Sequence, residues 1–161
     1  MNTFPGDNGE RERLLEMLAT AYWMEIETVM NYIASSVNAD GVRAREVAEH
    51  LEQEITDEIG HAQEFAQRIK ELYGVVPGSM DFEATQVALQ PPAEQTDIVH
   101  TIKGVIEAET RAIEHYSDMI EFCEAFDLVT QDMVIAIKRD EEKHRRLFEG
   151  FLREYEAQGR A

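Results

Sequence analysis

The sequence contains two copies of one short acidic motif that also carries a histidine. Residues 57–65 read Asp-Glu-x-x-His-x-x-x-Phe, and residues 140–148 repeat the same pattern 83 residues later. A Glu and a His three residues apart lie on one face of an α-helix. Each copy could therefore direct one carboxylate and one imidazole toward the same metal ion, because both groups are good ligands for divalent iron and manganese.

A single Glu-x-x-His pair means little in a chain with 33 acidic residues and 5 His, but a second repeat accompanies this one. Glu25 stands seven residues before Tyr32, and Glu109 stands seven residues before Tyr116 at an offset of 84. Two different motifs thus recur in the same order at nearly the same spacing. The chain therefore reads as two copies of a helical hairpin.

Each candidate ligand sits in the middle of a line of apolar residues spaced by seven, which places that line on one side of a helix. These lines are Leu18–Glu25–Tyr32, Leu51–Glu58–Phe65–Leu72, Ile102–Glu109–Tyr116–Cys123, Val134–Glu141–Phe148–Tyr155 and Ile137–His144–Phe151. An ionised carboxylate in an apolar seam is costly unless it is paired or binds a metal. The pattern predicts a pair of metal ions in a bundle core, with six ligands: Glu25, Glu58, His61, Glu109, Glu141 and His144.

Several acidic and aromatic neighbours leave alternatives open. Glu107 competes with Glu109, but its line of residues spaced by seven is polar and reads as a solvated face. Glu27 and Glu54 lie beside the site in the sequence and could contact the ligands, but a surface position is favoured for both. Tyr32 and its counterpart Tyr116 could hydrogen-bond the ligands, supply an electron, or simply be core aromatic residues with satisfied hydroxyls.

Four long helices must position these side chains. Helical periodicity covers residues 9–37, 42–73, 96–126 and 129–156, with Thr96 as the expected N-cap of the third helix, all within one domain over residues 1–161. Residues 74–95 break the pattern with Gly and Pro. A second helix of about 45 Å needs a connection of this length if the third helix runs parallel to it. The prediction is an all-α four-helix bundle of two antiparallel hairpins joined by one long crossover.

The composition narrows the class of function. The net charge of −18 argues against nucleic acid as a partner, because phosphates would be repelled, and it favours attraction of cations. One cysteine excludes an internal disulfide framework and a Cys-x-x-Cys metal site. The sequence carries no signal peptide and no run of 18 apolar residues, so we expect a cytoplasmic protein without a membrane partner.

The four-helix pattern with these ligands resembles the ferritin-like superfamily, and most closely bacterioferritin and the Dps-like ferritins that keep a di-iron centre within one subunit. Glu25 with Tyr32 and the motifs at 57–61 and 139–144 match the bacterioferritin pattern. The resemblance implies ferroxidase activity, in which iron(II) is oxidised by dioxygen or peroxide at two iron ions, with manganese as a possible alternative, followed by iron storage. It implies that Glu58 and Glu141 bridge the metals and that Tyr32 belongs to the catalytic set.

Departures from the bacterioferritin pattern refine this expectation. Ile59 stands where bacterioferritin has its haem-ligating Met, so no haem is predicted, and Gln53 replaces a His that helps bind iron on the inner surface. Only 17 residues follow His144, which leaves little room for the short fifth helix of 24-subunit cages. A homo-oligomeric shell of 12 subunits is therefore favoured over 24 subunits or a dimer.

The same ligands would also serve other functions. One alternative is a di-metal enzyme without storage, such as a rubrerythrin-like peroxidase or a manganese catalase-like protein. A third hypothesis is a structural bundle with a polar core, which does not account for six candidate ligands in register.

Overall fold

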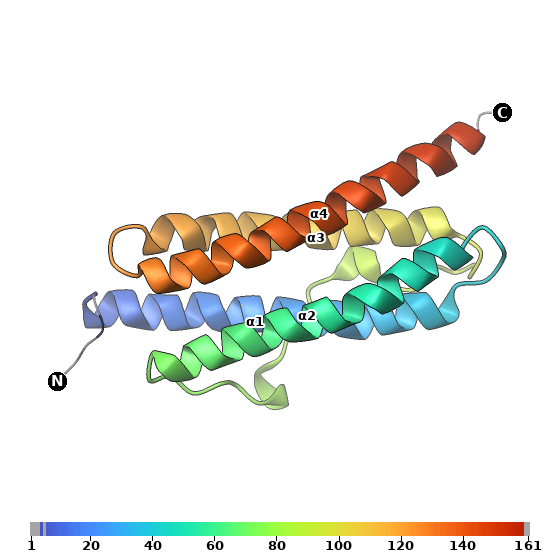
Figure 1. Cartoon of the computed structure of the whole chain (residues 1–161). Helices are drawn as coiled ribbons and strands as arrows, with labels where there is room; N and C mark the ends of the chain where they lie inside the picture. Colours follow the sequence, from blue (N-terminus) through green and yellow to red (C-terminus); the bar gives the residue numbers. More distant parts are fainter. Residues whose placement is uncertain (1–3, 5, 160–161) are drawn as a thin grey trace.

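The computed structural model describes residue 4 and residues 6–159, and it consists of four long helices joined by short turns and one long connection (Figure 1). The helices are α1 (Asn8–Asn38), α2 (Arg45–Glu71), α3 (Ile98–Cys123) and α4 (Leu128–Gln158). The closest packing lies within two hairpins, α1 with α2 and α3 with α4. The predicted all-α four-helix bundle is therefore confirmed.

Local capping explains where the helices begin. Asp7 and Glu10 form a reciprocal capping box at the start of α1. Asp97, rather than the expected Thr96, caps α3 by accepting a hydrogen bond from the His100 amide. Helix α2 begins at Arg45, because the residues just before it form the turn after α1.

The apolar core is divided into two clusters along the bundle. One cluster packs around Leu14, Leu18, Phe65 and Met119, and the other packs around residues that include Leu51, Ile102 and Phe148. The candidate ligands lie between these clusters in the chain on every helix. The bundle thus holds a polar layer between two apolar ones.

The connection between the hairpins passes along α1 and α3. It contains two short 3-10 turns, η1 (Ser79–Asp81) and η2 (Val87–Leu89), and η2 packs against α3. A Cβ atom on Gly104 would lie 2.6 Å from the Ala88 carbonyl oxygen, so this close approach requires glycine. On the α1 side, Glu27 accepts hydrogen bonds from the Thr85 and Gln86 amides. Its expected surface position was wrong, since Glu27 is 3% exposed.

No helix among residues 4 and 6–159 is long and apolar enough to cross a membrane.

Candidate metal centre

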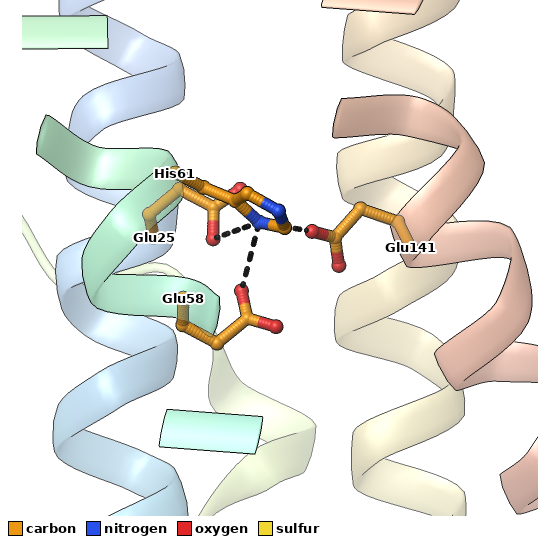
Figure 2. A group of neighbouring side chains, drawn as sticks. All are labelled: Glu25, Glu58, His61 and Glu141. Atoms are coloured by element: carbon orange, nitrogen blue, oxygen red, sulfur yellow. Dashed lines mark ion pairs between the residues drawn. The ribbon is translucent and has the colours of Figure 1, made fainter. Parts of the chain in front are cut away.

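The four helices bring all six sequence-predicted ligands together at mid-bundle. Each helix contributes one buried carboxylate, and these four side chains are at most 2% exposed: Glu25, Glu58, Glu109 and Glu141. With two imidazoles they form two overlapping groups whose potential ligand atoms lie within 4.8 Å of one another. The first group is Glu25, Glu58, His61 and Glu141 (Figure 2), and the second is Glu58, Glu109, Glu141 and His144.

Glu58 and Glu141 belong to both groups, which is the arrangement that two bridging carboxylates require. The third-helix position is resolved by burial, because Glu109 is 2% exposed whereas Glu107 is exposed to solvent. The residue that the heptad argument favoured is therefore the buried one of this pair.

Both imidazoles turn the same nitrogen toward the carboxylates. His61 Nδ1 lies 2.8 Å from Glu141 Oε1 and 3.8 Å from one oxygen of Glu25 and of Glu58, as Figure 2 shows. His144 Nδ1 lies 3.2 Å from Glu58 Oε1 and 3.8 Å from Glu141 Oε2. In each ring Nδ1 is the nitrogen available to a metal, and Nε2 points away from the cluster.

The centre is incomplete in hydrogen bonds, which is the test of whether a metal fits. Five buried atoms among the ligands lack a hydrogen-bond partner: Glu58 Oε1, His61 Nδ1, Glu109 Oε2, Glu141 Oε1 and His144 Nδ1. The short approach of His61 Nδ1 to Glu141 Oε1 is therefore not aligned as a hydrogen bond.

Buried polar atoms are rarely left unpaired. Four carboxylates would balance two divalent cations, and oxygen with imidazole nitrogen suits iron or manganese. The residues present fit a pair of such ions.

Protonation takes the place of metal charge in the metal-free protein. Burial raises the pKa of Glu58 and of Glu109, and neighbouring carboxylates raise each further. Burial, with repulsion from Glu58 and Glu25, raises the pKa of Glu141 to about 8. Burial favours the neutral form of His61, but the close carboxylates of Glu141, Glu25 and Glu58 favour its charged form and raise the pKa of His61. Metal binding must therefore displace protons.

The pKa values of Glu25 and His144 are lowered rather than raised. Burial would raise the pKa of Glu25, but contacts with Glu58, His61 and Tyr116 lower it instead. Burial lowers the pKa of His144, which favours the neutral imidazole that can bind a cation. The two histidines of the repeat are thus in different electrostatic environments.

Two tyrosines brace the centre from the opposite hairpin. The Tyr32 hydroxyl on α1 donates to Glu109 on α3, and the Tyr116 hydroxyl on α3 donates to Glu25 on α1. Both tyrosines are fully buried. Burial and the neighbouring carboxylates raise the pKa of each phenol. Both hydroxyls thus hydrogen-bond the candidate ligands from within the apolar core, which combines two of the roles that the sequence allowed.

Three acidic residues near the centre had no assigned role in the sequence. Asp140 Oδ2 lies 3.2 Å from His61 Nε2, and Asp57 Oδ2 lies 3.6 Å from His144 Nε2. The signal for these contacts was the repetition of Asp before both Glu residues. Glu54 was expected at the surface, but it is 6% exposed and its Oε2 atom has no hydrogen-bond partner.

The chain matches known proteins along most of its length. The family model described as a ferritin-like domain matches residues 15–157. A DNA protection during starvation protein from Pyrococcus furiosus is 28% identical over 145 residues, which cover 88% of this chain and 77% of that protein. A bacterioferritin from Desulfovibrio desulfuricans is 27% identical over 146 residues, which cover 89% of this chain and 77% of that protein.

Solved structures share the fold. The D. desulfuricans bacterioferritin structure, described with its diiron site in different catalytic states, aligns with a TM-score of 0.80 at 23% identity over 96% of this chain and 87% of that one. A dodecameric thioferritin related to bacterioferritin, from Bacteroides fragilis, aligns with a TM-score of 0.77 at 21% identity over 93% of this chain and 90% of that one.

Proposed function

Because this chain belongs to the ferritin-like family, we propose that it is a ferroxidase that oxidises iron(II) with dioxygen or peroxide and stores the oxidised iron. The observation that carries this proposal is the pair of overlapping ligand groups that share Glu58 and Glu141. These residues would hold two iron(II) ions side by side, and such a pair would supply two electrons to the oxidant. A pair of manganese ions would suit the same ligands.

The ligand roles follow the geometry of the two groups. Glu58 and Glu141 would bridge the ions, since each lies in both groups. Glu25 with His61 would complete one position, and the second position would be completed by two ligands from the other hairpin, Glu109 and His144. The unpaired buried oxygens and nitrogens of this set support these roles.

The tyrosines would tune the centre rather than bind metal. Tyr32 donates a hydrogen bond to Glu109, so we assign it to hold that carboxylate and to supply an electron during oxidation. Its raised pKa means that the phenol keeps its proton unless it is oxidised. No haem is proposed, because Ile59 stands at the position of the bacterioferritin haem ligand.

Storage requires a shell, and α1 and α2 offer a surface for self-association. Met30, Ile33 and Val37 lie on one stripe of α1 and are 54%, 48% and 77% exposed, and Ile33 and Val37 line a surface hollow together with Ile55 of α2. Contiguous exposed apolar groups mark interaction surfaces. We propose a homo-oligomer, and a shell of 12 subunits is supported by the dodecameric state of the B. fragilis relative. The cytoplasmic location stays a prediction.

The direct test is aerobic loading with iron(II), followed by size-exclusion chromatography and a count of the iron retained per chain. Many irons per chain on a large particle are expected for a ferritin-type store. About two irons per chain on a small oligomer would instead support the di-metal enzyme without storage. Glu58→Ala and Glu141→Ala should lose the retained iron while keeping the helical fold, and unchanged iron in both variants would contradict either function.

A further inference from the structure

The solvent-exposed face of α4 carries a line of arginines in a chain of net charge −18. Six of the 15 basic residues of the chain lie in this one helix: Lys138, Arg139, Lys143, Arg145, Arg146 and Arg153. Arg139, Arg146 and Arg153 are spaced by seven, so they lie on nearly the same side of α4, and all three are exposed. This arginine stripe extends over about 21 Å of the helix axis.

The three arginines of the stripe have no partner within the described part of the chain, where none of them makes a hydrogen bond or an ion pair. The glutamates three or four residues away from them on α4 each lie near another cation. These pairs are Glu142 with Lys138 at 3.4 Å, Glu149 with Arg145 at 3.8 Å and Glu156 with Lys103 at 4.0 Å between nitrogen and oxygen. The stripe therefore keeps its positive charge although the sequence places carboxylates within its reach.

A surface hollow lies over the first half of the stripe. It is lined by six residues of α4: Arg139, Glu142, Lys143, Arg146, Leu147 and Gly150. Its volume of about 620 Å³ is in the range of sites that bind small molecules. Lys143 stands between the two arginines and is 70% exposed, with Asp140 as a distant partner at 3.9 Å. A Cβ atom on Gly150 would have only Arg146 Nη1 within 4 Å, so the hollow is open at that end.

Three cations around one hollow favour a ligand that carries several negative charges. A guanidinium group presents a planar fork of N–H donors that matches two oxygens of a phosphate, and it stays charged at physiological pH. The ammonium group of Lys143 adds a point charge between the two forks. Arg139 and Arg146 are about 10 Å apart along the helix axis, so an anion with linked phosphate groups can bridge them better than a single phosphate.

The charge of the whole chain favours a small anion over a macromolecule. Charges more than about 8–10 Å apart are largely screened at physiological salt, so an anion confined to the hollow interacts mainly with the stripe. A nucleic acid or a second copy of this chain would also cover surface beyond the stripe. That surface is predominantly acidic, because the chain has 33 Asp and Glu against 15 Lys and Arg. Both would therefore be repelled there.

We propose that the hollow lined by Arg139, Lys143 and Arg146 is a binding site for a small polyphosphate anion, either an inorganic polyphosphate or the phosphate chain of a nucleotide. The two arginines bind the ends of the phosphate chain, and Lys143 contacts its middle. These three side chains are at the surface, whereas Glu141 of the same helix is buried in the metal centre. Binding here needs no metal, so it can be measured on the metal-free protein.

The test is isothermal titration calorimetry of the assembled, metal-free protein with tripolyphosphate. Arg139→Gln and Arg146→Gln should each weaken binding by about 5–10-fold, between the effects of an exposed ion pair and of a hydrogen bond to a charged group. Lys70→Gln is the matched control, because Lys70 is exposed in the last turn of α2, outside the stripe. It removes the same charge and should change the affinity by less than about 2-fold.

Two results of this titration would overturn the proposal. The first is a parent protein that does not bind tripolyphosphate. The second is an equal loss of affinity in Lys70→Gln and Arg146→Gln, which would mean that only the net charge matters. Iron retention should be the same in Arg146→Gln as in the parent, so a failure of the polyphosphate site is distinguished from a failure of the metal centre.

Titration with other ligands identifies the source of the phosphate chain. Equal affinities for ATP and tripolyphosphate would mean that the phosphate chain alone is recognised. Tighter binding of ATP would assign the site to a nucleotide, whose base could contact Leu147, which is 37% exposed. Orthophosphate should bind more weakly than both. Competition by a short DNA duplex, or a changed particle size in Arg146→Gln with tripolyphosphate binding intact, would assign the stripe to a macromolecular contact and contradict the proposal.

Discussion

Glu25 and Glu27 stand two residues apart on α1 and are almost equally buried, at 2% and 3% exposure, yet they belong to two contrasting regions. Glu25 faces the bundle centre, where its neighbours include the carboxylates of Glu58 and Glu141. Glu27 faces the crossover, where it accepts from the Thr85 amide at 2.8 and 3.0 Å and from the Gln86 amide at 2.8 Å.

The two regions differ in whether the protein alone completes them. Around Glu27 the polar network is closed, because the Gln86 side chain donates to Thr28 at 2.7 Å and accepts from Asn31 at 2.9 Å. Around Glu25, three other carboxylates and both histidines share too few donors, and five of their buried atoms are unpaired. Burial therefore does not distinguish a structural carboxylate from a ligand. The supply of hydrogen-bond donors does, and at the bundle centre bound metal cations would make up for the missing donors.

The largest expected difference between the two regions concerns metal binding. Glu25→Gln removes a carboxylate from one ligand group, so Co(II) affinity should fall by more than the roughly 10–100-fold that is typical when an orienting group is lost. Glu27→Gln should bind as many ions per chain as the parent, because its contacts are with the crossover. Equilibrium dialysis against Co(II) gives the affinity and the number of bound ions per chain for both variants. Equal losses in the two would mean that the regions are not independent.

The second prediction concerns the stability of the metal-free protein, where Glu27 should matter more than a carboxylate of the bundle centre. Glu27→Ala leaves two backbone N–H groups without their acceptor, which should cost about 2–3 kcal/mol of unfolding free energy and lower Tm by about 4–12 °C. Glu109→Gln should be neutral or stabilising, because it removes a carboxyl whose charged form is disfavoured by burial and by Glu141. Thermal unfolding in the presence of a chelator measures both changes.

Glu83→Ala is the control for the crossover, since Glu83 is an exposed glutamate in the same segment and should change stability by less than about 0.5 kcal/mol. A Glu109→Gln variant that unfolds as readily as Glu27→Ala would show that the central carboxylates stabilise the fold without metal. That result would remove the contrast between the two regions.

The same contrast explains which features could be predicted from the sequence. Apolar residues spaced by seven located the candidate ligands and the four helices, because residues on the buried side of a helix recur at this spacing whatever packs against them. The surface position expected for Glu27 was wrong, because its partners come from an irregular crossover that has no period. The partners of Asp57 and Asp140 were not predictable either, although the repeat places an Asp before each Glu. Their contacts depend on how the two hairpins face each other, which no spacing within one helix encodes.

Glu54 shares features with both regions. It has a buried unpaired oxygen like the candidate ligands, but it lies outside both ligand groups. Burial, with a smaller contribution from Asp57, raises the pKa of Glu54 to about 8 from its ordinary value of 4.5. Between these pH values the folded chain keeps a proton that the unfolded chain has released. Stability must therefore fall as pH rises through this window, by at most about 1.4 kcal/mol per pH unit for this one group.

Glu54→Gln replaces the protonated acid by a neutral side chain of similar shape, so it should remove this part of the pH dependence. Near pH 4.5 the variant and the parent should unfold at the same urea concentration, and at pH 8 the variant should be the more stable of the two in the presence of a chelator. A difference that does not depend on pH would mean that Glu54 is already ionised and has a donor, as Glu27 has. It would then belong with the structural carboxylates rather than with the unpaired ones.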